Sequence, residues 1–437
     1  MLRNVSINYI LIVAFIIFFQ LSALGQENKS TTLKLDLEKS IDMALKSSEN
    51  FQIQDNEVKR NKYKYNIERS EILPQINGEL GWSNNFEYPD VPAAAHTKDY
   101  DAYSGVAISQ KIFTFGKVYS TIKAAKDAIE VSKHDKETLR QKIIYDTKLA
   151  YYTAYLAKRT LEIAEDSYQN ALKNKEILQK RSFTGRVSKH DNIKISADLA
   201  ARKPTVNNAR TSYYSAIETL KVILGVEQNK KLELTEGFSD QHFSFERDSM
   251  ALALYNNQPA IKSLAKTIFE KESLVNSKKA AYYPEVSAFA SWSHKGNSNN
   301  SYMGKNSLDD YGIAGLKVDI PFWTGGKTNA ELEQARIDKK NAELRYQQGK
   351  EDYLLELDKA LNEYKGYVET LESNQEAVRL AEKAFELSQE IFQSGQISVT
   401  DLNDSELKLT NEKLNKEITL FNISITLAKI ERLTLIR

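Results

Sequence analysis

The stretch Pro74–Trp82, with the sequence PQINGELGW, recurs as Pro284–Trp292, with the sequence PEVSAFASW, at an offset of 210 residues. Each copy begins with proline, ends with tryptophan and has apolar side chains at alternate positions, which is typical of a strand with one apolar face. The same offset, without a gap, relates Gly116-Lys117 to Gly326-Lys327. A unit of this length exceeds any solenoid repeat, so the sequence predicts two copies of one supersecondary module.

Each module is predicted to contain two strands joined by a polar hairpin loop. Alternating apolar residues place the first pair at about 75–87 and 101–113 and the second pair at about 285–295 and 310–322. A shorter helix precedes each pair. Strands of this length are near the ~9 to 11 residues that a tilted strand needs to cross a bilayer. A soluble antiparallel sheet with one face on a core would show the same alternation.

Both modules continue into very long helices. Residues 117–183 contain neither Pro nor Gly, residues 327–393 contain no Pro, and each span corresponds to about 100 Å of helix at about 1.5 Å per residue. Apolar residues in steps of three and four, as within 354–371, predict supercoiled packing along a seam. Return helices are predicted at about 188–224 and 398–436. The expected fold class is therefore mainly α with a small β part.

These elements divide the chain into four segments. Residues 33–225 form the first predicted structural repeat, 249–437 the second, and 226–248 the linker between them. Residues 1–25 are predicted to be a secretory signal peptide, because Arg3 precedes an apolar run that ends before small residues. The protein is therefore expected to be exported.

Composition excludes several classes of protein. Cleavage of the signal peptide would remove one of the 60 basic residues, so that 59 basic residues face 59 acidic ones, and this balance argues against nucleic acid as a partner. The absence of cysteine excludes a disulfide scaffold and a thiolate metal site. The five histidines have no metal-ligand spacing, and no nucleophile elbow or dinucleotide fingerprint occurs. No enzyme activity, cofactor or metal is expected.

Aromatic residues cluster near the loop ends of the predicted strands. Trp and Tyr favour the membrane–water interface, which makes four of them candidates for an interfacial belt: Trp82, Tyr103, Trp292 and Tyr311. Four strands are too few for a membrane barrel, whose minimum is about eight. Insertion into a membrane would therefore require strands from several copies of the chain.

The two junctions between a long helix and its return helix share one pattern, a glycine followed by Ser-x-x-Asp: Gly185, Ser188 and Asp191 in the first, Gly395, Ser398 and Asp401 in the second. This pattern predicts a glycine C-cap followed by a capping box. The same hairpin tips are candidate docking points for another protein. Asp401 and Asp404 lie one helical turn apart, so both could face a lumen, although acidic residues also favour a helix start.

Taken together, these residues resemble the TolC-like outer membrane efflux proteins, or outer membrane factors. Besides the repeat, the resemblance is carried by four runs: Ala253–Ile261, Phe113–Lys117, Pro321–Lys327 and Ile223–Gly225. It implies a homotrimer with a 12-strand β-barrel in the outer membrane, continued by a 12-helix coiled-coil α-barrel in the periplasm, with the linker in the equatorial region. It also implies passive conduction, within a tripartite efflux or type I secretion system, from an inner-membrane pump and a periplasmic adaptor.

For the sites, the resemblance implies that the two hairpin tips dock the adaptor and that Asp401 and Asp404 line the periplasmic constriction. The chain departs from some relatives, which have tyrosine and arginine where this sequence has Phe392 and Ile397. A periplasmic coiled-coil adaptor, or a coiled-coil structural protein, remains the alternative. Neither needs four strands of membrane-spanning length or two equal halves.

Overall fold

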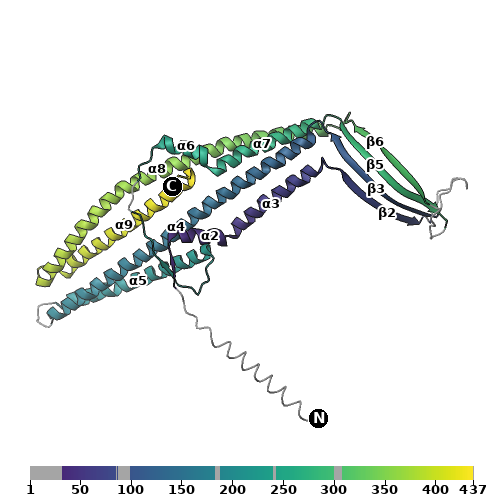
Figure 1. Ribbon diagram of the computed structural model, residues 1–437. Helices are drawn as coiled ribbons and strands as arrows, with labels where there is room; N and C mark the ends of the chain where they lie inside the picture. Colours follow the sequence, from purple (N-terminus) through teal and green to yellow (C-terminus); the bar gives the residue numbers. More distant parts are fainter. Residues whose placement is uncertain are drawn as a thin grey trace, which may run out of the picture. The chain divides into compact units, whose positions relative to one another are not determined.

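The structure, a computed structural model, describes residues 32–84, 86, 99–182, 188–239, 243–299 and 308–436. Within these residues the chain is mainly helical and has one four-stranded and one two-stranded sheet (Figure 1). It forms two compact units. Unit 1 comprises Met1–Ser47, Asp146–Gln241 and Tyr367–Ile425, and unit 2 comprises Ser48–Tyr145, His242–Gly366 and Thr426–Arg437.

The four-stranded sheet belongs to unit 2. Its strands are β2 (Gln75–Asn84), β3 (Tyr100–Phe113), β5 (Glu285–Ser298) and β6 (Asp309–Asp319), all antiparallel and in the order β2-β3-β5-β6. β5 continues past the predicted end near residue 295, because its register with β3 extends to Ser298. β6 stops before the predicted residue 322, and Pro321 lacks the N–H that a longer strand would need.

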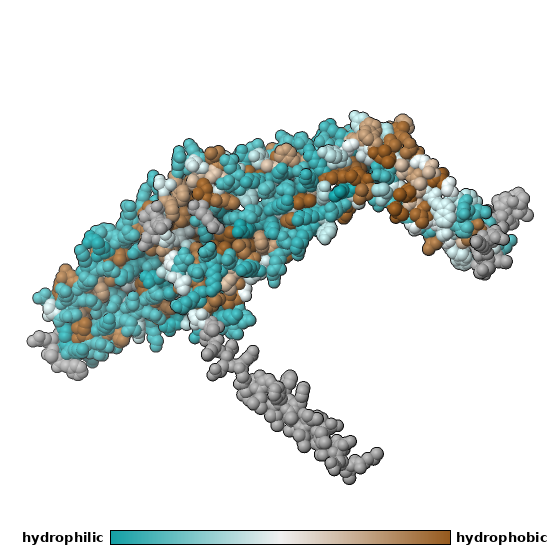
Figure 2. All heavy atoms as spheres, viewed as in Figure 1, coloured by the Kyte–Doolittle hydropathy of each residue, from teal (hydrophilic) through white to brown (hydrophobic). Residues whose placement is uncertain are grey.

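The register gives this sheet one apolar and one polar face. Side chains alternate between the faces of a strand, so residues paired across the sheet share a face. The apolar face carries Ile76, Leu80, Trp82, Val106, Ile108, Trp292, Leu316 and Val318. These large side chains are exposed to solvent rather than packed in a core, and Figure 2 shows apolar residues gathered over the sheet and the adjoining helix ends.

Each half of the chain has the same order of elements: a helix, a pair of strands, a long helix and a return helix. Among the described residues, six longer helices belong to this pattern. In the first half they are α3 (Glu49–Ser70), α4 (Lys117–Ser182) and α5 (Lys189–Leu224). In the second half they are α7 (Pro259–Ala280), α8 (Lys327–Ser394) and α9 (Val399–Thr434). Prolines 74 and 284 follow the ends of α3 and α7, where the missing N–H prevents a helix from continuing.

Short elements occupy the segment predicted as a linker. β4 (Leu232–Leu234) pairs in parallel with β1 (Leu33–Leu35), and α6 (Arg247–Asn257) begins inside the linker's expected bounds. A further helix, α2 (Leu37–Ser47), follows β1. The segment 226–248 stays the predicted linker between the repeats, and the structure adds β4 and the first residues of α6 to it. A three-residue strand depends on its distant partner, so its own sequence carries too little pattern to reveal it.

In unit 1 one part of the core lies between the ends of four helices. Leu178 of α4, Ile195 of α5, Phe392 of α8 and Leu402 of α9 are almost fully buried in one apolar cluster. In unit 2 a smaller cluster joins Val275 of α7 to Leu332 and Ala335 of α8. These contacts follow the spacing of three and four residues that the sequence shows, as expected for helices packed along a seam.

Candidate functional site

The connection between α8 and α9 has the two caps that its sequence predicts. Gly395 adopts a left-handed conformation with φ of 85°, and its N–H donates to the Phe392 carbonyl at 3.0 Å. The Ser398 hydroxyl and N–H donate to the Asp401 carboxylate at 2.8 and 3.1 Å. These hydrogen bonds, first from the hydroxyl and then from the backbone, lower the pKa of Asp401. The contribution of these hydrogen bonds to folding stability is present when the pH is above the ordinary pKa of an aspartate. It is lost as the pH falls through the lowered pKa of Asp401.

The connection between α4 and α5 ends in an equivalent cap. The Asp191 N–H donates to the Ser188 hydroxyl at 3.0 Å, and that hydroxyl donates to the Asp191 carboxylate at 2.8 Å. Gly185, the third residue predicted for this tip, lies outside the described residues. On α9 both Asp401 and Asp404 are exposed, while Leu402 and Asn403 between them are buried. The two aspartates therefore share one exposed side of the helix.

The two helix hairpins are joined to each other within unit 1. The Arg181 guanidinium donates to the Phe392 carbonyl at 2.8 Å and lies over the Phe392 ring, 5.5 Å from its centroid. A Cβ on Gly395 would come within 2.5 Å of Arg181. The Lys194 ammonium donates to the Thr400 hydroxyl at 2.5 Å. At Phe392, therefore, an arginine from the other hairpin contacts both the carbonyl and the ring.

A buried polar layer lies further along the same helices. Asn403 donates to Asp198, and Arg202 pairs with Glu406, which is only 1% exposed. Arg202 also donates to the Ser167 hydroxyl at 2.5 Å, so it bridges α4 and α9 from its place on α5. Sequence reasoning missed these residues, because charges at helical spacing more often lie on a solvated face.

The four candidate interface aromatics do not share one face of the sheet. Trp82 and Trp292 are on the apolar face, where Trp82 stacks on Tyr100 with centroids 5.7 Å apart. Tyr103 pairs with Gly81 and Tyr311 with Ser293, which puts both tyrosines on the polar face. The assignment of the four residues to the membrane interface stays a prediction, and the two tyrosines face the opposite side of the sheet from the tryptophans because each lies an odd number of residues from the apolar positions of its strand.

A second aromatic group occurs at the helix end of the sheet. Phe115 stacks on Tyr283 with centroids 5.2 Å apart and meets Phe113 edge-on at 4.6 Å. Phe322 and Trp323, between β6 and α8, are almost fully exposed. The sequence marks these residues only as parts of runs that resemble a family. Their exposure at the edge of an apolar surface is typical of aromatic side chains at a membrane interface.

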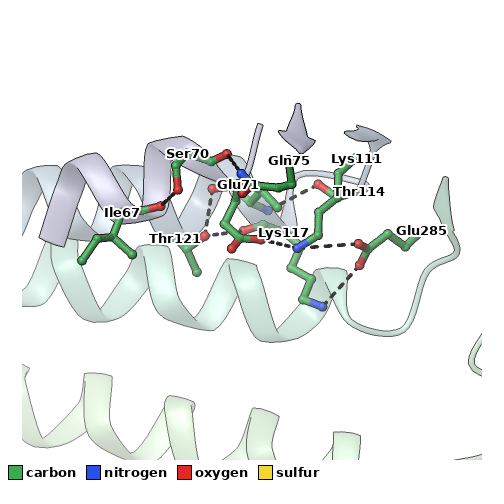
Figure 3. A network of polar contacts seen from close by, with 10 residues as sticks. Ile67, Ser70, Glu71, Gln75, Lys111, Thr114, Lys117, Thr121 and Glu285 are labelled. Atoms are coloured by element: carbon green, nitrogen blue, oxygen red, sulfur yellow. Dashed lines mark hydrogen bonds and ion pairs between the residues drawn. The ribbon is translucent and has the colours of Figure 1, made fainter. Parts of the chain in front are cut away.

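Ion pairs connect the sheet to the neighbouring helix ends in unit 2 (Figure 3). Lys111 of β3 pairs with Glu71 beyond α3, and Lys117 at the start of α4 lies 3.5 Å from Glu285 of β5. The Gln75 amide also donates to the Ser70 carbonyl at 2.9 Å. These contacts fix the points where helices become strands. The local sequence does not indicate which of these residues form contacts, because the partners come from separate elements.

The Asn257-Gln258 pair, part of the run Ala253–Ile261, has a structural role. Asn257 donates to the Thr434 carbonyl at 3.0 Å, and the buried Gln258 amide donates to the carbonyls of Arg432 and Leu433, both at 3.2 Å. The last carbonyls of a helix have no partner within the helix. The two amides satisfy them at the end of α9.

Two features are absent from the residues that the structure describes. In this part of the chain, no helix combines the length and the apolar character that a membrane span requires. The same residues contain no group of three or more His, Cys, Asp or Glu side chains placed to hold a metal ion.

Known proteins resemble the chain over nearly its whole length. The sequence pattern of the outer membrane efflux protein family matches residues 40–226 and 252–429. The solvent efflux pump outer membrane protein SrpC of Pseudomonas putida is 21% identical over 401 residues, which are 87% of this chain and 83% of that protein. The cation efflux system protein CusC of Escherichia coli O157:H7 is 18% identical over 374 residues, 84% of this chain and 79% of CusC.

Solved structures share the fold. The CmeC outer membrane channel of Campylobacter jejuni superimposes with a TM-score of 0.81 at 18% identity, covering 91% of this chain and 85% of CmeC. A CusC structure has a TM-score of 0.79 at 18% identity and covers 94% of this chain and 95% of CusC. Because the family pattern matches most of both halves, the chain belongs to the outer membrane efflux protein family, whose members are transport channels of the outer membrane and not enzymes.

Proposed function

We propose that the protein is the outer-membrane component of a tripartite efflux or type I secretion system and that it acts as a homotrimer. Three copies would supply a 12-strand barrel in the outer membrane and a 12-helix coiled-coil tunnel in the periplasm. Substrates would pass through without energy input from this chain, because an inner-membrane pump drives the transport. The observation that carries the proposal is the four-stranded sheet. Its apolar face is exposed, and each of its edge strands, β2 and β6, pairs with only one other strand among the described residues.

The internal repeat indicates how one copy meets the next. Within the chain, β3 of the first half pairs with β5 of the second, with Val106 opposite Trp292 and Ile108 opposite Ala290. Applying the offset of 210 residues to these pairs puts Leu316 opposite Trp82 of the partner subunit. It likewise puts Val318 opposite Leu80 of the partner subunit. All four side chains belong to the apolar face, so the inferred register keeps that face continuous.

The helices next to the sheet support the same arrangement. On α7, Ser263, Ser273 and Ser277 are 7%, 2% and 6% exposed. Their counterparts on α3, at the offset of 210 residues, are Ile53, Tyr63 and Ile67, which are 58%, 70% and 63% exposed. Helix α7 contacts α4 on one side and α8 on the other, through Ser263–Asp135 and Lys278–Glu331. Helix α3 also contacts α4, as in Asp55–Lys136, but leaves these three side chains exposed. A partner's α8 would cover the open side.

The hairpin tips are the proposed docking points for the periplasmic adaptor. Ser188 and Asp191 cap the start of α5 in the first tip, to which Gly185 belongs by sequence, and Gly395, Ser398 and Asp401 form the capped turn of the second. Polar contacts between the hairpins hold the described tip residues in one cluster. A partner protein would therefore meet a preformed surface, which reduces the ordering cost of association.

The mass of the detergent-extracted particle tests the proposal. We expect the mature protein in the outer-membrane fraction, with a protein mass near three times that of one chain when light scattering is corrected for bound detergent. The apolar face of the sheet makes detergent necessary, because large exposed apolar surfaces associate in water. A soluble monomer in the periplasmic fraction would contradict the proposal and would favour the adaptor alternative.

The proposed periplasmic constriction makes a separate prediction. In a trimer Asp401 and Asp404 would supply up to six carboxylates, which attract cations to the entrance. We expect the Asp401→Ala/Asp404→Ala protein to show weaker block by divalent cations in planar-bilayer recordings. Asp404→Asn alone should weaken the block while leaving the Ser398–Asp401 cap intact. Unchanged conductance and unchanged cation block in both variants would contradict the proposal that these residues line the constriction.

A further inference from the structure

Two neighbouring rows on the polar face of the sheet combine tyrosine rings with charged groups. The register aligns Gly81, Tyr103, Lys295 and Asp309 across the four strands. The next row towards the helices contains Glu79, Gly105, Ser293 and Tyr311. These rows lie near the loop ends of the strands. We call Glu79, Tyr103, Lys295, Asp309 and Tyr311 the tyrosine–carboxylate surface.

The two tyrosine rings are held against the sheet with part of their surface open. A Cβ on Gly81 would overlap the Tyr103 ring, so this ring rests directly on the strand backbone beside it. Tyr103 is 48% exposed and Tyr311 is 49% exposed. Only glycine at position 81 leaves room for such an approach, which is a common reason for glycine inside a strand.

One cation already lies on an aromatic face of this surface. The Lys295 ammonium is 4.5 Å from the centroid of the Tyr311 ring, within the roughly 6 Å over which a ring face attracts a positive charge. Arrangements of this kind bind ammonium ligands in other proteins. Within this surface, therefore, a tyrosine ring already contacts a positive charge, the Lys295 ammonium.

The fixed charges of the two rows favour a cation as well. Glu79 and Asp309 face one lysine, Lys295, so carboxylates are in excess. Towards the helix end of the same face, Lys317 pairs with Asp319 at 3.0 Å, and the charges balance. The negative excess thus lies in the loop-side half of this face, where Asp101 in the next row adds a further carboxylate.

We propose that the tyrosine–carboxylate surface selects organic cations, in which a positive charge is joined to an apolar or aromatic group. The inference rests on the proposed function, in which the apolar face contacts lipid and the polar face lines the channel. A solute of this class would place its apolar part on the rings and its charge near the carboxylates. An inorganic anion or an acidic solute would find neither contact.

Block of the reconstituted channel by benzyltrimethylammonium, added on the loop side, measures this selection. We expect Tyr103→Leu and Tyr311→Leu each to weaken the block about two- to five-fold, because leucine keeps apolar volume but lacks the ring. Tyr103→Phe should retain the wild-type block. In a KCl gradient, Asp309→Asn should move the reversal potential towards zero by reducing the preference for potassium.

Asp310 provides a matched control for Asp309. It is the next residue in the sequence but shares the apolar face with His294, to which it bonds at 2.7 Å. Asp310→Asn should leave the reversal potential unchanged. Equal reversal potentials for the two asparagine variants, or wild-type block in Tyr103→Leu, would overturn the inference while leaving the channel function intact. A reconstituted wild-type protein without ion conductance would contradict both this inference and the proposed function.

Discussion

Oxidation of the Leu80→Cys/Val318→Cys protein in its membrane is expected to convert the chain into a covalent trimer. The inferred register puts the new thiol at position 318 of each copy directly opposite the new thiol at position 80 of the next copy. Directly opposite residues in antiparallel strands have Cβ atoms about 4.5–5.5 Å apart, close to the ~3.5–4.5 Å of a disulfide. A denaturing gel without reductant would show a band at three times the monomer mass. The natural chain has no cysteine, so no native thiol competes with the two introduced ones.

The control is a pair displaced by one residue. In Leu80→Cys/Lys317→Cys the two cysteines lie on opposite faces of the sheet, because side chains alternate along each strand. This protein should remain monomeric on the same gel, as should each single variant. A trimer band from the displaced pair together with none from the matched pair would show that the register is wrong. Monomer bands throughout would contradict the joining of β6 to β2 of the partner subunit.

The strands of the large sheet could be predicted because their signal is local. Alternation of apolar side chains and the prolines at 74 and 284 lie within the strand sequences or next to them. The faces of Tyr103 and Tyr311 were predictable for the same reason. Tyr103 lies three residues before Val106 and so must point to the other side.

The polar layer between the hairpins could not be predicted in this way. Asp198 and Arg202 are one turn apart on α5, which is equally consistent with an exposed pair on one helix. Their partners, Asn403 and Glu406, follow about two hundred residues later. The contact depends on how the two hairpins pack, and no periodicity in either segment encodes that. The β1–β4 pair escaped prediction for the same physical reason.

Glu406→Ala is expected to destabilise the helical part of the protein strongly. Removing the carboxylate leaves the Arg202 charge, whose side chain is only 12% exposed, without its charged partner, and breaking a buried ion pair from one side costs about 3–5 kcal/mol. Hydrogen exchange in detergent should show the loss as faster exchange of backbone amides in α5 and α9. Denaturant unfolding of the same sample measures the change in free energy where the transition is reversible.

Two further variants separate the ion pair from simple loss of a side chain. Arg202→Met/Glu406→Leu replaces both charges by apolar groups of similar size, which is often neutral or stabilising at a buried site, so protection should return. Lys413→Ala breaks an exposed ion pair between α9 and Glu382 of α8, at 3.1 Å, and should change stability by less than about 1 kcal/mol. Equal losses in the single and the double variant would mean that packing volume, and not the unpaired charge, determines the stability of this layer.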